Sequence, residues 1–173
     1  MLQKKICMVG MFGTGKTSLV RQFVYARFNE RYHATVGVKI DRKVVMVDDI
    51  ELTLVLWDLA GRDVLSEASP VFLRGALRGA HGLIYVADGT DPATCRAVGA
   101  LQQTANGIVG DVPSIIALNK ADLVDRWVMS DAERNALSAS SPVVCTSAKT
   151  GDHVEGIFET LAEALARGGR TTR

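Results

Sequence analysis

Cysteine is scarce in this sequence: there are three among 173 residues, and they stand far apart at Cys7, Cys95 and Cys145. No two of them have the close spacing of a metal-binding or redox motif, so neither a disulfide framework nor a zinc site is expected. Single cysteines are ordinary in a reducing compartment, and we therefore expect a cytoplasmic protein.

Long apolar runs and an excess of one charge are also missing. The apolar runs are far shorter than the roughly 18–20 residues that a membrane-spanning helix needs. Lys4 and Lys5 precede a run of strand length, which is unlike a secretory leader. The net charge is +1, so no strong field favours binding to nucleic acid or to an anionic membrane. These absences leave an ordinary globular domain with no nucleic-acid partner.

What the sequence has instead is a regular alternation of strand-like and helical segments. Strands are expected at residues 3–9, 38–47, 50–57, 82–87, 113–118 and 142–146. The turn Asp48-Asp49 predicts an antiparallel hairpin, and most other strands are continuous apolar runs, typical of strands buried on both faces. We therefore predict one α/β domain over residues 1–167. It is a three-layer fold with a six-stranded, mostly parallel sheet, one antiparallel strand and helices on both faces.

Helical patterns separate these strands. They are expected to begin within the glycine-rich loop (running to about Phe28), at Pro70 with Ser69 as N-cap, after Asp91-Pro92 (running to near Gly107), at Ser130 and at Asp152. Ser130 and Asp152 are each followed three residues later by a glutamate, which is the spacing of a capping box. In a doubly wound sheet of this kind, a ligand binds beyond the carboxyl ends of the strands.

Residues 10–17 read Gly-Met-Phe-Gly-Thr-Gly-Lys-Thr, which satisfies the pattern G-x-x-x-x-G-K-[ST] between a strand and a helix. Backbone N–H groups around Gly13 and Gly15 would face a phosphate at the helix N-terminus, where the helix dipole favours negative charge. Lys16 is expected to reach the β- and γ-phosphates, and the Thr17 hydroxyl to bind Mg²⁺. The expected phosphate-binding set is Gly13, Thr14, Gly15, Lys16, Thr17 and Ser18.

Two further strand ends carry residues suited to a bound nucleotide. Near the end of the third strand, Asp58 can hold a water on Mg²⁺, and Gly61 allows the backbone to approach a γ-phosphate. The fifth strand ends in Asn119-Lys-Ala-Asp122. The Asp122 carboxylate can accept from two N–H groups of guanine that adenine lacks, which favours GTP over ATP, and the Lys120 stem can cover the base. The expected base-binding set is Asn119, Lys120, Asp122, Ser147, Ala148 and Lys149.

In their order these motifs resemble those of the Ras superfamily of small GTPases, and the resemblance covers essentially residues 3–167. Trp57-Asp58 and Thr35-Val-Gly-Val38 are most similar to the Rab branch. The resemblance implies the G-domain form of the P-loop NTPase fold, with GTP or GDP and Mg²⁺ bound. It also implies a switch that effector and regulatory proteins contact through residues 29–40 and 60–78.

The resemblance further implies roles for three loop residues. Thr35 would bind Mg²⁺ when the γ-phosphate is present, so that the metal-binding set is Thr17, Thr35 and Asp58. Phe28 would pack against the guanine; the alternative is a core aromatic that closes the first helix. Tyr32 would cover the phosphates; the alternative is an exposed loop tyrosine.

Two residues depart from the family pattern near the γ-phosphate. The family usually has glutamine directly after the glycine of D-x-x-G, where this chain has Arg62, and arginine cannot accept a hydrogen bond from water. Phe12 replaces a usually small residue, so its ring would crowd the attacking water and an arginine finger. We therefore expect slow GTP hydrolysis, unless Arg62 or a partner supplies the missing group. The expected catalytic set is Lys16, Thr35, Gly61 and Arg62.

The end of the chain departs from the family as well. Residues 167–173 lack the cysteine of a prenylated terminus, so we expect a short flexible tail over 168–173 with no lipid anchor, as in prokaryotic relatives. Two other functions remain open from the sequence. One is a GTP-bound scaffold that hardly hydrolyses, which Phe12 and Arg62 favour; the other is an ATP-using kinase, against which Asp122 argues.

Overall fold

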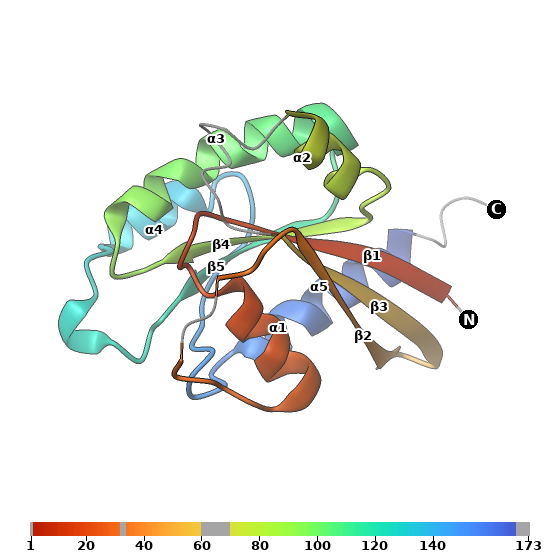
Figure 1. The fold of residues 1–173 in the computed structure, drawn as a ribbon, viewed down its shortest axis with the longest axis horizontal. Helices are drawn as coiled ribbons and strands as arrows, with labels where there is room; N and C mark the ends of the chain where they lie inside the picture. The colour runs from red at the N-terminus through yellow and green to blue at the C-terminus, as the bar shows by residue number, and fades with distance from the viewer. Residues whose placement is uncertain (1, 32–33, 60–69, 169–173) are drawn as a thin grey trace.

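The structure is a computed structural model that describes residues 2–31, 34–59 and 70–168. Within these ranges a six-stranded sheet has the order β2-β3-β1-β4-β5-β6. Its strands are β1 (Leu2–Val9), β2 (Val38–Val47), β3 (Ile50–Leu59), β4 (Gly82–Asp88), β5 (Ser114–Asn119) and β6 (Val143–Cys145). Strand β2 pairs antiparallel with β3, and the other neighbouring pairs are parallel. The predicted α/β fold is thus confirmed (Figure 1).

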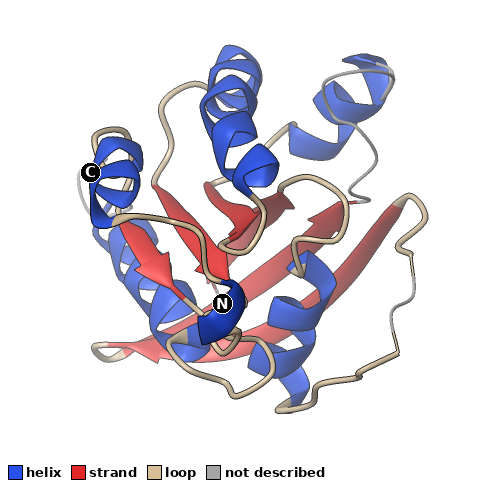
Figure 2. Cartoon of the chain, turned by 90° about the vertical axis from the view of Figure 1, so that its left-hand side faces the viewer, coloured by secondary structure: helices blue, strands red, loops and turns tan. Residues whose placement is uncertain are grey.

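Helices cover both faces of this sheet. They are α1 (Lys16–Tyr25), α2 (Pro70–Leu77), α3 (Pro92–Val109), α4 (Asp131–Leu137) and α5 (Val154–Gly168), with a 3₁₀ turn, η1 (Val124–Arg126). Helices α1 and α5 pack on one face, and α2 and α3 pack on the other (Figure 2). Among the helices described, none is long and apolar enough to cross a membrane.

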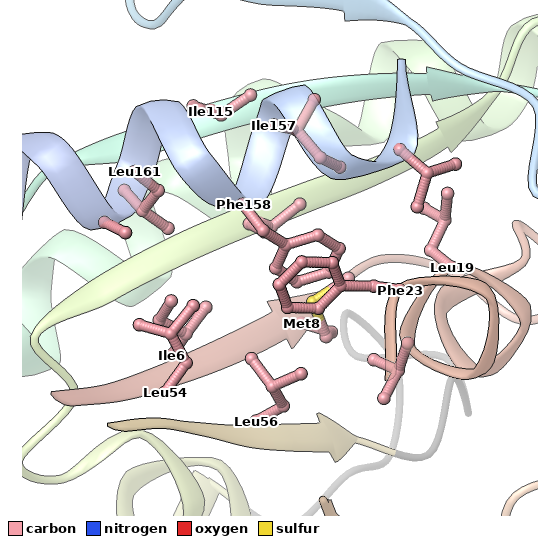
Figure 3. Packing of buried hydrophobic residues seen from close by; sticks show 14 of the residues in the cluster. Ile6, Met8, Leu19, Phe23, Leu54, Leu56, Ile115, Ile157, Phe158 and Leu161 are labelled. Carbon is pink, nitrogen blue, oxygen red and sulfur yellow. The ribbon is translucent and has the colours of Figure 1, made fainter. Parts of the chain in front are cut away.

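Two stacked phenyl rings join α1 to α5. The ring centroids of Phe23 and Phe158 lie 4.0 Å apart with planes 8° from parallel, next to Met8 and Leu19 (Figure 3). The Lys43 ammonium donates to the Phe23 carbonyl at 2.7 Å, in the last turn of α1. Burying a phenylalanine side chain contributes roughly 1.5–3 kcal/mol. The helix that follows the glycine-rich loop is therefore held firmly against α5.

One helix boundary near the ligand-binding edge differs from the sequence prediction. Helix α1 ends at Tyr25 rather than near Phe28, because Ala26 has a left-handed backbone with φ 50°. The Ala26 N–H donates to the Gln22 carbonyl at 3.0 Å, which closes the helix. Phe28 therefore lies in the loop after α1, and its interpretation as the residue that closes the first helix is wrong.

Among the other helix starts, that of α5 differs from the sequence prediction. This helix begins at Val154 rather than Asp152, because His153 has φ 55° and interrupts the helical backbone. The predicted capping box at Ser130 and Glu133 is present at the start of α4. Helix α2 begins at Pro70 as expected, and Ser69 lies outside the described residues.

Candidate functional site

A cavity of about 380 Å³ lies at the carboxyl ends of the parallel strands. Figure 2 views the molecule from this side. Its walls come from the loop after β1 and the start of α1, the loop after β5 and the loop after β6. Residues 28–31 and Thr35 close a further side. This is the position expected for a ligand of a doubly wound sheet.

The glycine-rich loop forms one end of the cavity, with α1 beginning directly behind it at Lys16. Gly13 and Gly15 have φ of 76° and 98°, values that side chains with a Cβ rarely adopt. A Cβ at Gly15 would also collide with the Asn119 amide. Because the loop packs so closely, its backbone and the positive end of α1 face the cavity, as phosphate binding requires.

Lys16 is buried at this end. Its ammonium donates to the carbonyls of Gly10 and Met11, at 2.8 Å each. Burial lowers the pKa of Lys16 to about 8, and the nearby Asp58 opposes that shift. The side chain is therefore still mostly protonated at neutral pH, and it offers a positive charge where the sequence predicts phosphates.

Three oxygen-bearing side chains converge beside the glycine-rich loop. The Thr17 hydroxyl donates to Asp58 Oδ2 at 2.5 Å and lies 2.7 Å from the Thr35 hydroxyl. The other carboxylate oxygen, Asp58 Oδ1, is buried and has no hydrogen-bond partner among the residues that the structure describes. Burial raises the pKa of Asp58, against opposing effects of the Thr17 hydrogen bond and the Lys16 charge.

This set of oxygens fits Mg²⁺, which binds through one or two carboxylates and other oxygen ligands. A buried carboxylate oxygen without a partner is costly, and a bound cation would relieve that cost. Elsewhere in the described ranges, no group of three His, Cys, Asp or Glu residues gathers as an alternative metal site. The predicted metal-binding residues Thr17, Thr35 and Asp58 are thus brought together.

Asn119 links three loops at the opposite end of the cavity. Its Nδ2 donates to the Thr14 carbonyl at 3.0 Å, and its Oδ1 accepts from the Ala148 N–H at 3.1 Å and the Thr146 hydroxyl at 3.3 Å. Asn119 lines the cavity, but its side chain bonds to other protein groups. These hydrogen bonds hold the base-binding loops against the glycine-rich loop.

Asp122 reaches the cavity from the loop after β5. Its Oδ1 accepts from the Ser147 hydroxyl at 2.6 Å, so the carboxylate has a fixed orientation and a second oxygen remains as an acceptor. Ser147 itself is fully buried and supports Asp122, while Ala148 and Lys149 line the cavity. Lys120 lines it too, with its ammonium 2.6 Å from an Asp88 carboxylate oxygen.

The mouth of the cavity carries two exposed phenylalanines. Phe28 is 39% exposed and lines the cavity, as does Lys149, whose ammonium is 3.8 Å from a Glu30 carboxylate oxygen. Phe12 is 55% exposed and lines the cavity at the glycine-rich loop. Both rings are therefore placed to contact a ligand rather than the core.

Three predicted site residues, Tyr32, Gly61 and Arg62, lie outside the described residues, and so does most of the segment 60–78. Sequence reasoning also missed contributors that the structure shows, chiefly Asp88. A signal for Asp88 existed, because it is an acidic residue at the carboxyl end of an apolar strand, as Asp58 is. No motif extends to it, and its partner Lys120 is distant in sequence.

Comparison with known proteins gives consistent matches over the same span. The model of the Ras family matches residues 5–167. The Ras-related protein Rab-1 of Theileria annulata is 33% identical over 165 residues, which cover 93% of this chain and 73% of that protein. The Ras-related protein SEC4 of Saccharomyces cerevisiae is 32% identical, with 93% and 74% covered. The Ras-related protein Rab-7b of Mus musculus is 32% identical, with 94% and 83% covered.

Proposed function

The chain belongs to the Ras family of small GTPases, with Rab-like relatives, and on that premise we propose that it is a slowly hydrolysing guanine-nucleotide switch. The observation that carries the proposal is that one continuous cavity is lined by both the glycine-rich loop and Asp122. GTP or GDP binds there with Mg²⁺, and effector and regulatory proteins contact residues 29–40 and 60–78.

The phosphates bind at the N-terminus of α1. Lys16 supplies a positive charge, and the loop N–H groups around Gly13 and Gly15 supply hydrogen-bond donors. Mg²⁺, held by Thr17, Thr35 and Asp58, would neutralise charge on the β- and γ-phosphates. The hydroxyl contact between Thr17 and Thr35 connects the loop around residue 35 to this metal-binding site.

That connection gives the switch its physical basis. Thr35 belongs to the segment before β2, and its hydroxyl contact with Thr17 joins this segment to the phosphate end of the cavity. A ligand that holds Thr35 orders this segment, and loss of the γ-phosphate releases it. Proteins that bind residues 29–40 can therefore distinguish the two nucleotide states.

Guanine is selected at the other end. The Ser147 hydroxyl orients Asp122 so that its remaining oxygen can accept from the base. A site that pairs specific donors strongly rejects analogues that lack them. Purified protein should therefore retain labelled GDP against a large excess of ATP but exchange it against GTP. Equal competition by ATP would overturn the guanine-specific function in favour of an ATP-using enzyme.

Slow hydrolysis follows from two side chains. Arg62 has no acceptor with which to orient water, and the exposed Phe12 ring occupies the cavity wall on the phosphate side. Single-turnover hydrolysis of bound GTP, followed as GDP formation over hours, tests this directly. Arg62→Gln should accelerate the reaction, and an unchanged rate would contradict the role given to Arg62.

A second candidate function is a GTP-bound scaffold with hardly any turnover, and the exposed Phe12 favours it. If GTP stays intact in the wild-type protein over hours, the scaffold or a partner-activated enzyme is the better description. Conversion within minutes to about an hour would instead require another way of positioning water, and the scaffold would be discarded.

A further inference from the structure

Asp88, the last residue of β4, lies outside every nucleotide-binding motif but is bonded directly to one of them. One of its carboxylate oxygens lies 2.6 Å from the Lys120 ammonium. We propose that Asp88 is a positioning residue for the guanine base: it fixes Lys120 so that the methylene stem of the lysine stays on the base-binding wall of the cavity. This inference rests on the guanine-nucleotide binding proposed above.

The Asp88 carboxylate is held on both oxygens. The residue is 7% exposed, and Oδ1 accepts from the Thr90 N–H at 2.9 Å and the Thr90 hydroxyl at 2.7 Å, while Oδ2 faces Lys120. Burial acts to raise the pKa of Asp88, but the hydrogen bonds from Lys120 and Thr90 outweigh it and the net shift is downward. The carboxylate is thus a fixed negative charge at neutral pH.

Lys120 is fixed at its backbone as well as at its ammonium. Its φ is 70°, a left-handed conformation that is uncommon for a residue with a side chain. Its carbonyl accepts from the Leu123 N–H at 2.9 Å, within the turn after β5. With both ends held, the methylenes between them are restrained along the cavity, which Lys120 lines. Such a restrained stem covers a base with little further loss of side-chain entropy.

Gly89, the residue after Asp88, binds both ends of the loop after β5. The Gly89 N–H donates to the Asn119 carbonyl at 3.0 Å, and the Gly89 carbonyl accepts from the Val128 N–H at 3.0 Å. The Trp127 ring packs so closely on Gly89 that a Cβ there would collide with it. The loop after β5 is therefore attached to the end of β4 at its start and its finish, and the Asp88–Lys120 ion pair attaches it in between.

A purely structural role for Asp88 is the competing explanation. The residue also helps to form the turn between β4 and α3, where its backbone N–H donates to the Thr94 hydroxyl at 2.9 Å. A structural role would lower stability without depending on Lys120. A positioning role requires the effects of changing Asp88 and Lys120 to be coupled in nucleotide release, because each acts through the other.

The test measures release of a fluorescent GDP from Asp88→Asn, Lys120→Met and the double variant, with Mg²⁺ present. Asparagine keeps an acceptor for Thr90 but leaves the lysine ammonium without a negative partner. We expect Asp88→Asn to release GDP about tenfold faster than wild type, which is the scale of losing a charged hydrogen bond. The double variant should release no faster than the faster single variant.

Asp91→Asn is the matched control. It removes the same charge from the same connection, and asparagine can still cap α3 through the acceptor that now receives the Ala93 N–H at 3.0 Å. GDP release from Asp91→Asn should equal that from wild type. If Asp88→Asn fails to fold, Thr90→Val removes one hydrogen bond from the Asp88 carboxylate and should still accelerate release.

The outcomes separate this inference from the function on which it rests. Wild-type protein that does not retain GDP would overturn both. Wild-type retention with release unchanged in Asp88→Asn, or with single-variant effects that simply multiply in the double variant, would overturn the positioning role alone. The positioning role is supported if the wild-type protein retains GDP and the effects of Asp88→Asn and Lys120→Met on GDP release are coupled in the double variant.

Discussion

The two ends of the cavity are built in different ways. The phosphate-binding loop at one end comes from one continuous stretch, in which Lys16 bonds to carbonyls five and six residues before it, and only the metal-binding oxygens of Thr35 and Asp58 are added from elsewhere. The base end is assembled from distant segments: Asn119 bonds to Thr14 across 105 positions, and Asp88 pairs with Lys120. A site made from local backbone can be recognised as a motif, whereas a site made from long-range contacts depends on the whole sheet.

The largest effect is expected where the two ends meet, at Gly15. Gly15→Ala places a Cβ against the Asn119 amide and strains a backbone with φ 98°, so GDP affinity should fall about a thousandfold. Gly13→Ala is the control, because φ is 76° there but a Cβ meets no atom of the described residues within 4 Å. Titration with fluorescent GDP should show a much smaller loss for it; equal losses would mean that the contact between the ends is unimportant.

The next effect isolates the base end. Asp122→Asn keeps an acceptor for the Ser147 hydroxyl but replaces the oxygen that faces the base with an NH₂ group. GDP affinity should fall about a hundredfold, while the diphosphate of xanthosine, whose ring has a carbonyl in place of the exocyclic amine, should bind better than GDP. Measured affinities that fall alike for both nucleotides would argue for general damage to the loop.

A smaller effect is expected from the packing of Trp127 on Gly89, which supports the loop after β5 at the base end. Gly89→Ala overpacks the Trp127 ring, which should loosen the loop after β5 and accelerate GDP release about tenfold. Gly99→Ala, within α3, adds a Cβ that meets nothing within 4 Å in the part of the chain that the structure describes. It should leave release unchanged while slightly stabilising the helix. Stopped-flow release that is identical for both variants would show that the base end does not depend on this packing.

The smallest effect concerns pH at the phosphate end. Burial lowers the pKa of Lys16 to about 8, so above that pH the unliganded protein loses the positive charge. Bound phosphate favours the protonated amine, and binding then requires uptake of a proton. GDP affinity should be constant between pH 6 and 7 and weaken by up to about tenfold per unit above pH 8. Lys16→Arg should remove that dependence, since arginine stays charged.

The contrast between the ends also explains what the sequence predicts well. The glycine-rich loop is a contiguous pattern whose conformation follows from glycines at positive φ and a helix start, so its position and role could be read directly. The strands followed from continuous apolar runs, because β4 is buried on both faces along its whole length. Asp58 and Asp122 could be found because they follow such runs.

What the sequence could not predict depends on side chains that meet across the fold. Ala26 ends α1 early through a backbone conformation that alanine does not favour intrinsically, and His153 displaces the start of α5 in the same way. Tertiary contacts override local propensity at both positions. Asp88 was overlooked for a related reason: its partner is set by the parallel pairing of β4 with β5, which places Asp88 opposite Asn119.

The close packing of Trp127 on Gly89 also restricts how this sequence can diverge. The ring fills the space that any side chain at position 89 would need, so the two positions are not independent in evolution. A lineage that replaces the glycine has first to reduce the tryptophan, and one that keeps the tryptophan keeps the glycine. Among homologues, we expect larger residues at position 89 to occur together with small residues at position 127.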